Sequence, residues 1–160
     1  MIVKNRKFDI RAWVTVTDWN PLTIWYFKKP YVRLPAHDYN PMDLSNNYSH
    51  LANNSIAKYA DENTTQFHIE GNMMFIEELQ EHLLNLHCYD VYEEVIEEKI
   101  KSLVINTLES VQDTFEYKKG CFELYGFDIM IDEEFNVWLI EVNSSPAMDY
   151  STHITEKLVK

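Results

Sequence analysis

The chain of 160 residues has little of what marks membrane, secreted or disordered proteins. It holds only three glycines and five prolines, which argues against a long flexible linker. Its two cysteines, Cys88 and Cys121, are a poor disulfide framework, and no CxxC or HxxxH spacing predicts zinc. No apolar run reaches the ~18–20 residues of a membrane span, and the first residues lack a signal peptide's apolar core. We therefore expect one ordinary domain in a reducing cytoplasmic setting, without a membrane partner.

Basic residues are scarce except at the start of the chain, where the net charge of −12 is reversed locally. Residues 1–33 hold seven of the fourteen basic residues and two acidic ones, a balance of +5, so the remainder carries −17. An acidic chain binds nucleic acid poorly, so we expect no nucleic-acid partner. The basic first segment can attract a phosphate or an acidic peptide.

The first segment has the alternation of strands. Over residues 8–17 every second residue is apolar, which predicts a strand with one buried face. A turn at 18–21 leads to a partner strand over 23–28, and residues 31–34 form a third short strand. Residues 35–71 read as a long ordered loop, and a loop of that length inside a domain usually has a task.

The second half contains two helices followed by a hairpin. Apolar residues at helical spacing predict helices over 72–86 and from Asp90 to about 113, with Asp90 as the N-terminal cap of the second. Residues 121–132 and 137–143 read as strands joined by a four-residue loop, 133–136. The sequence thus predicts an α+β fold, a mainly antiparallel sheet with two packed helices.

Polar side chains in the predicted hairpin suggest a metal site. If Asp132 pairs with Val137, Asp128 stands opposite Glu141, and Asn143 points to the same face as Glu141. Two adjacent carboxylates repel each other unless a cation lies between them, and oxygen ligands of this kind suit Mg²⁺. The alternative is that both acids face solvent at the edge of the sheet, and a one-residue slip in register would destroy the site.

The first strand carries charged side chains that suit a polyphosphate. Lys7, Asp9 and Arg11 share one face, and Arg33 lies on the third strand, close enough to join them. Guanidinium groups bind phosphate in a bidentate manner, and lysine acts as a mobile point charge. The alternative is a surface ladder of ion pairs that contributes little to stability.

Several segments, in order, resemble the C-terminal region of the tubulin tyrosine ligase-like family. Arg-Lys-Phe-Asp-Ile-Arg at 6–11 is followed by Asp-Trp-Asn-Pro-Leu-Thr-Ile-Trp at 18–25. His-Leu-Ala-Asn-Asn-Ser-Ile at 50–56 is similar to the family's His-Leu-Thr-Asn-Tyr-Ser-Ile. The segments 122–128 and 138–146 resemble its closing hairpin. The likeness spans nearly the whole chain, and the ordered set is far more specific than any single motif.

The resemblance implies that residues 1–160 are the C-terminal lobe of an ATP-grasp fold, whose two α+β lobes clasp ATP. It also implies a reaction in which ATP phosphorylates a carboxylate on tubulin and the amine of a free amino acid attacks the acyl phosphate. Positioning and charge neutralisation carry most of such phosphoryl transfer. By this resemblance, Asp128, Glu141 and Asn143 would bind Mg²⁺, and Arg11 and Arg33 would bind the phosphates and stabilise their charge. Lys7 and Asp9 would contact the nucleoside, and Asn53 would contact the ribose. The catalytic residues would be Arg33, Arg11 and Glu141.

The segment 18–25 is most similar to the glycylase branch, which implies glycine as the donor, tubulin and microtubules as partners, and a place in the cytoskeleton of cilia and axonemes. A polyglutamylase that uses free glutamate, and a non-catalytic tubulin-binding remnant, are the alternatives. Two departures favour the remnant. Ala52 replaces the family's threonine, and the N-terminal half of the family's domain, with further phosphate-binding lysines, is missing from these residues.

Overall fold

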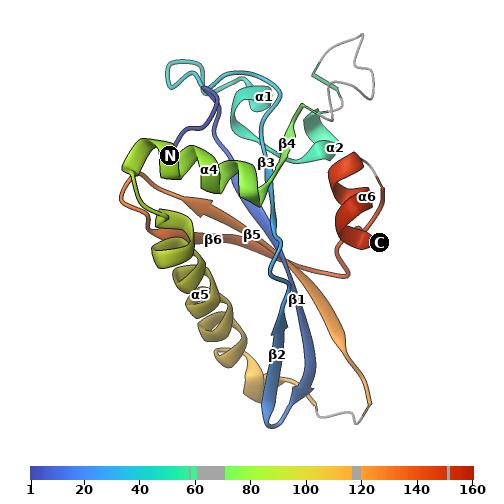
Figure 1. The fold of residues 1–160 in the computed structure, drawn as a ribbon. Helices are drawn as coiled ribbons and strands as arrows, with labels where there is room; N and C mark the ends of the chain where they lie inside the picture. Colours follow the sequence, from blue (N-terminus) through green and yellow to red (C-terminus); the bar gives the residue numbers. More distant parts are fainter. Residues whose placement is uncertain (58, 61–70, 117–119, 151) are drawn as a thin grey trace.

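A computed structural model describes residues 1–57, 59–60, 71–116, 120–150 and 152–160. These residues form a six-stranded sheet in which every pair of neighbouring strands is antiparallel. The strand order is β4-β3-β1-β5-β6, and β2 pairs with the far end of β1 (Figure 1). The strands are β1 (Asp9–Trp19), β2 (Leu22–Tyr26), β3 (Tyr31–Arg33), β4 (Met73–Phe75), β5 (Glu123–Ile131) and β6 (Val137–Ser144).

Two long helical segments and several short ones surround the sheet. The long ones are α4 (Ile76–His87) and α5 (Glu97–Glu109), which continues directly from a π-helical turn, η1 (Tyr92–Ile96). As predicted, Asp90 caps this second segment, because its carboxylate accepts a hydrogen bond of 3.0 Å from the backbone N–H of Glu93. The short ones are α1 (Asn47–His50), α2 (Asn54–Ala57), the 3₁₀ turn η2 (Gln112–Thr114) and α6 (His153–Val159).

The main core lies between one face of the sheet and helices α4 and α5. The alternating apolar residues of β1 face this core, as the sequence predicts, and from Ile10 to Val16 none is more than 1% exposed. Leu79 and Leu83 of α4 and the apolar stripe of α5 pack against them. The expected α+β class with two packed helices is therefore confirmed. Among the described residues, the structure has no helix with the length and apolar character to cross a bilayer.

The other face of the sheet is also buried at its centre, which the alternation did not predict. Helix α6 covers a second apolar cluster there, built on Trp13, Tyr31, Met73 and Ile154. In Figure 1, α6 lies to the right of the sheet, whereas α4 and α5 lie to its left. Because α6 and the loop before it cover this face, the polar positions next to Trp13 are enclosed too, and they include the charged residues of the predicted site.

Three sequence predictions about elements need correction. The helix expected over 72–86 begins only at Ile76, because Met73–Phe75 instead pairs with β3 as strand β4. Helix α6 was not predicted. The loop expected over 35–71 contains α1 and α2, and residues 58 and 61–70 of it lie outside the described residues.

The register of the closing hairpin differs from the prediction at its tip and agrees at the site. Val137 pairs with Ile131 rather than with Asp132, so five residues rather than four connect the strands. A bulge between Asp128 and Ile129 then shifts the register by one residue. Asp128 consequently stands opposite Glu141, as predicted. Asp132 instead accepts hydrogen bonds within the connection, including one of 2.9 Å from the backbone N–H of Glu134.

Candidate functional site

The charged residues of four strands form one row across the sheet. Asp9 of β1 pairs with Arg33 of β3, two residues further Arg11 pairs with Asp128 of β5, and Asp128 pairs with Glu141 of β6. Cross-strand partners have their side chains on the same face of a sheet. The register of β1 with its neighbours therefore brings these residues together from segments that are far apart in the sequence.

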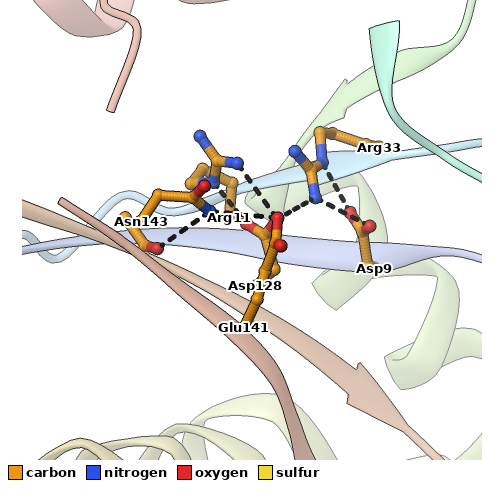
Figure 2. A network of polar contacts seen from close by, with 7 residues as sticks. Asp9, Arg11, Arg33, Asp128, Glu141 and Asn143 are labelled. Carbon is orange, nitrogen blue, oxygen red and sulfur yellow. Dashed lines mark hydrogen bonds and ion pairs between the residues drawn. The ribbon is translucent and has the colours of Figure 1, made fainter. Parts of the chain in front are cut away.

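Two buried arginines and two buried aspartates of this row form one network, which we call the arginine–aspartate cluster (Asp9, Arg11, Arg33 and Asp128). Arg33 donates to both carboxylate oxygens of Asp9, at 2.7 and 2.8 Å, and its Nη2 lies 2.8 Å from Oδ2 of Asp128. Arg11 also holds Asp128 at both oxygens, through Nε and, at 3.0 Å, through Nη2. Figure 2 shows Arg33 between the two carboxylates and the two guanidinium groups on the same side of them.

The cluster sets the charge state of its aspartates. Burial raises the pKa of Asp128, but the hydrogen bond from Arg11 and the charges of Arg33 and Arg11 outweigh it, so the pKa lies below its ordinary value. For Asp9, burial is the largest effect and raises its pKa above the ordinary value, although Arg33 acts in the opposite direction. Burial lowers the pKa of Arg33, but the hydrogen bond and charge of Asp9 raise it by more, so Arg33 stays charged.

Glu141 and Asn143 lie beside the cluster on the edge strand and remain accessible. Asn143 Nδ2 donates to Oε1 of Glu141 at 3.1 Å, which confirms that the two side chains point to the same face (Figure 2). Glu141 is exposed, whereas the neighbouring Asp128 is buried. The alternative in which both acids face solvent is therefore wrong for Asp128.

Most of the predicted site residues line a single pocket of about 200 Å³, which we call the acidic pocket. Lys7, Asp9, Asn53, Asp128 and Glu141 all line it, together with the loop residues His50, Leu51 and Ala52. Lys7 also lines an adjoining pocket of about 410 Å³, where its ammonium lies 4.8 Å from the centre of the Tyr39 ring. The structure thus brings the first strand, the loop and the hairpin together at one place.

Arg11 and Arg33 line a different pocket, of about 340 Å³, which we call the arginine pocket. Asn53 lines both this pocket and the acidic pocket. The arginine–aspartate cluster therefore separates two hollows, with its carboxylates lining one and its guanidinium groups lining the other. The alternative of a surface ladder formed by Lys7, Asp9 and Arg11 is wrong in two respects, because Asp9 and Arg11 are buried and Lys7 takes no part in the cluster.

The repulsion between the carboxylates of Asp128 and Glu141, from which the sequence predicts a metal ion, is reduced by two arginines of the protein itself. Arg11 and Arg33 already neutralise Asp128, so its proximity to Glu141 does not by itself require a metal ion. Among the described residues there is also no group of three or more His, Cys, Asp or Glu side chains that can hold a metal. The oxygen donors here are instead two carboxylates and one amide, from Asp128, Glu141 and Asn143, which is a donor set that Mg²⁺ accepts.

Comparison with known proteins identifies the family. The sequence profile of the tubulin-tyrosine ligase family matches residues 1–160. The chain belongs to the tubulin-tyrosine ligase family. The resemblance found in the ordered motifs is thereby confirmed, and the α+β sheet described above is the form that this part of the family's domain takes here.

Relatives within the tubulin-tyrosine ligase family include several proteins named for glycylation. Tubulin glycylase 3D of Tetrahymena thermophila is 47% identical over 161 residues, which cover 100% of this chain and 16% of the relative. The human tubulin monoglycylase TTLL3 is 37% identical over 99% of this chain and 21% of its own length. The human protein monoglycylase TTLL8 is 37% identical over 99% of this chain and 19% of its own length. The chain thus spans about a fifth or less of the curated relatives it matches.

The structure adds residues that the sequence pattern did not single out. Gly126 of β5 leaves room for the cluster, since a Cβ at this position would lie 2.9 Å from Cβ of Pro146 and 3.2 Å from Cδ of Arg11. A glycine within a strand often marks such a close approach, so this signal was present in the sequence. Asn54 and Asp149 of the arginine pocket carry no comparable signal, because only the fold brings α2 and the segment after β6 together.

Proposed function

We propose that this chain forms the phosphate- and metal-binding part of an ATP-dependent ligase that attaches glycine to glutamate side chains of tubulin. The observation that carries the proposal is the row of Arg33, Asp9, Arg11, Asp128 and Glu141 across four strands, which lies between two pockets. Support for the substrates comes from the relatives, whose names refer to glycylation of tubulin or protein.

In this proposal Glu141, Asn143 and Asp128 hold Mg²⁺. Glu141 is exposed, and the Oδ1 atom of Asn143 has no hydrogen-bond donor among the described residues. The Asp128 carboxylate accepts three contacts from arginine, which leaves about one of its four acceptor positions for a metal. The donor set therefore fits a hard cation. When bound, Mg²⁺ supplies charge neutralisation for the phosphates of ATP.

The residues of the acidic pocket suit the nucleotide. Lys7 lies where this pocket meets the 410 Å³ pocket, so its ammonium can reach a ligand in either. Asn53 lines the acidic pocket on the loop side and offers both a donor and an acceptor, which suits ribose hydroxyls. Ala52 is buried beside it, where the family's threonine would carry a hydroxyl, so one polar contact to the nucleotide is absent.

Arg11 and Arg33 provide fixed positive charge where negative charge is transferred. Their carboxylate partners hold Nε and Nη2, so neither guanidinium needs to reorganise, and no described residue accepts a hydrogen bond from either Nη1. Prearranged donors of this kind stabilise charge that develops during phosphoryl transfer. We assign the two Nη1 groups to the acceptor carboxylate and the phosphoryl group that it receives. The acyl phosphate that results reacts with an amine to form the amide.

A ligation assay tests this function. The protein is incubated with tubulin, ATP, Mg²⁺ and either labelled glycine or labelled glutamate. The proposal expects ATP-dependent incorporation of glycine into tubulin in this assay. In cells, it expects the glycylated tubulin to be that of the cytoskeleton and of cilia. Incorporation of glutamate alone would assign the chain to the glutamylases instead. No incorporation of either amino acid, by protein that binds microtubules, would favour the non-catalytic alternative.

A further inference from the structure

The arginine pocket contains hydrogen-bonding groups on more than one wall. Arg11 and Arg33 are 8% and 5% exposed, and their free Nη1 groups form a cationic wall. Elsewhere the pocket is lined by Asn54, from α2, and by Asp149, from the segment between β6 and α6. Groups of this kind select a ligand that carries both negative and positive charge.

Two acceptors in this pocket have no partner within the described part of the chain. The Oδ1 atom of Asn54 is buried and accepts no hydrogen bond. Buried acceptors in folded proteins almost always have a donor, so the unpaired oxygen of Asn54 at this pocket is an acceptor that a donor group of a ligand can use. Asp149 is the one carboxylate among the described residues that line the pocket, and none of the described residues forms an ion pair with it.

We propose that Asn54 and Asp149 bind the ammonium group of the amino acid that the ligase attaches. The inference rests on the proposed function, because it assumes that Arg11 and Arg33 hold the acceptor carboxylate in the same pocket. A volume of about 340 Å³ is more than glycine requires, which leaves room for an acceptor side chain beside it. The amine is thereby brought next to the activated carboxylate.

The same arrangement gives the proton a destination. An ammonium must lose a proton before it can attack, and Asp149 is the carboxylate placed to accept it. The nitrogen lone pair then forms the C–N bond while the C–O bond to the phosphoryl group breaks, and the second proton of the nitrogen leaves with the phosphate. Asp149 is exposed and returns its proton to water.

The test is the Asp149→Asn variant, compared with Asp113→Asn. Asp113 is also exposed but lies in η2, outside the arginine pocket, so both variants change the net charge equally. Binding of methylamine, acetate and glycine is measured by titration followed by NMR, and circular dichroism checks the fold. We expect Asp149→Asn to weaken methylamine and glycine about tenfold and to leave acetate unchanged, since a charge-assisted hydrogen bond to nitrogen is lost. The Asp113→Asn variant should bind all three probes like the wild type.

Binding of MgATP, measured in parallel, separates the two proposals. If all variants bind MgATP but methylamine binds equally to wild type and Asp149→Asn, the assignment of the amine site is overturned while the nucleotide site stands. If even the wild type binds no MgATP, the proposed function fails independently of the amine result. A loss of acetate binding in Asp149→Asn would also overturn the inference, because it would show that Asp149 acts through the arginines.

Discussion

Replacement of Arg33 by methionine examines whether the arginine–aspartate cluster is a true buried network. The Arg33 side chain is 6% exposed and that of Asp9 is 8% exposed, so solvent screens neither. Asp128 keeps Arg11 in this variant, whereas Asp9 loses both of its hydrogen bonds and its adjacent cation. Removing one partner of a buried ion pair costs about 3–5 kcal/mol, because an uncompensated charge remains. We therefore expect the free energy of unfolding to fall by about this amount.

The matched variant is Asp9→Leu combined with Arg33→Met. Replacing both members of a buried pair by apolar residues is often close to neutral, so the double variant should recover at least about 2 kcal/mol relative to Arg33→Met alone. Urea unfolding at neutral pH, followed by tryptophan fluorescence and circular dichroism, measures the free energy of unfolding of the wild type, the single variant and the double variant. A single variant within about 1 kcal/mol of wild type, with no recovery in the double variant, would refute the reasoning.

The pH dependence of the Arg33→Met variant gives an independent check. Burial already raises the pKa of Asp9, and loss of Arg33 removes the two largest effects that oppose that shift, its hydrogen bonds and its charge, leaving only the smaller effect of Arg11. A carboxyl whose pKa is raised by folding destabilises the protein above its folded pKa and costs nothing below the unfolded value of about 3.9. The stability difference from wild type should therefore shrink as the pH falls toward about 4.

Two further substitutions test the surroundings of the cluster. Gly126→Ala should lower stability by about 1–3 kcal/mol in urea unfolding, since the new Cβ overlaps Pro146 and the Arg11 side chain; unchanged stability would contradict the close approach. Asp132→Asn should lower the melting temperature at neutral pH. The hydrogen bond from Trp138, with others from Asn136 and Glu134, lowers the pKa of Asp132 to about 2. Its stabilisation is complete above about pH 4 and lost toward pH 2, so the deficit of the variant should vanish there; a deficit of equal size at pH 2 would count against this role.

The pattern of apolar residues was sufficient to predict most strands, because alternation fixes which face of β1 is buried. The pattern failed at residues 73–75, because three successive apolar residues fit a helix as well as a strand. They form strand β4 because β3 is available as a partner. The pattern also missed α6, whose seven residues are held by packing on Trp13 and Tyr31 rather than by strong helical periodicity. Tertiary contacts decide such short elements.

The sequence indicated which residues gather at the candidate site, but not which of them form ion pairs with one another. The hairpin prediction placed Asp128 opposite Glu141 for a reason that was only partly right, since the tip is shifted by one residue and a bulge compensates for it. The bonding of Asp128 to Arg11 and Arg33 depends on the order of strands in the sheet. No single segment contains that information, although the opposite charges of Asp9 with Arg33, and of Arg11 with Asp128, are consistent with cross-strand pairs.

Calorimetric titration of the protein with ATP, in the presence of Mg²⁺ and again with the ion removed by a chelator, tests the central claim most directly. The account predicts binding that weakens by at least about tenfold without Mg²⁺, and the same loss in Glu141→Gln even when the ion is present. The exposed Glu109→Gln variant at the end of α5, with the same change in charge but outside both pockets, should bind like wild type. Binding that is equally tight without Mg²⁺ and in Glu141→Gln would contradict the metal-assisted phosphate site.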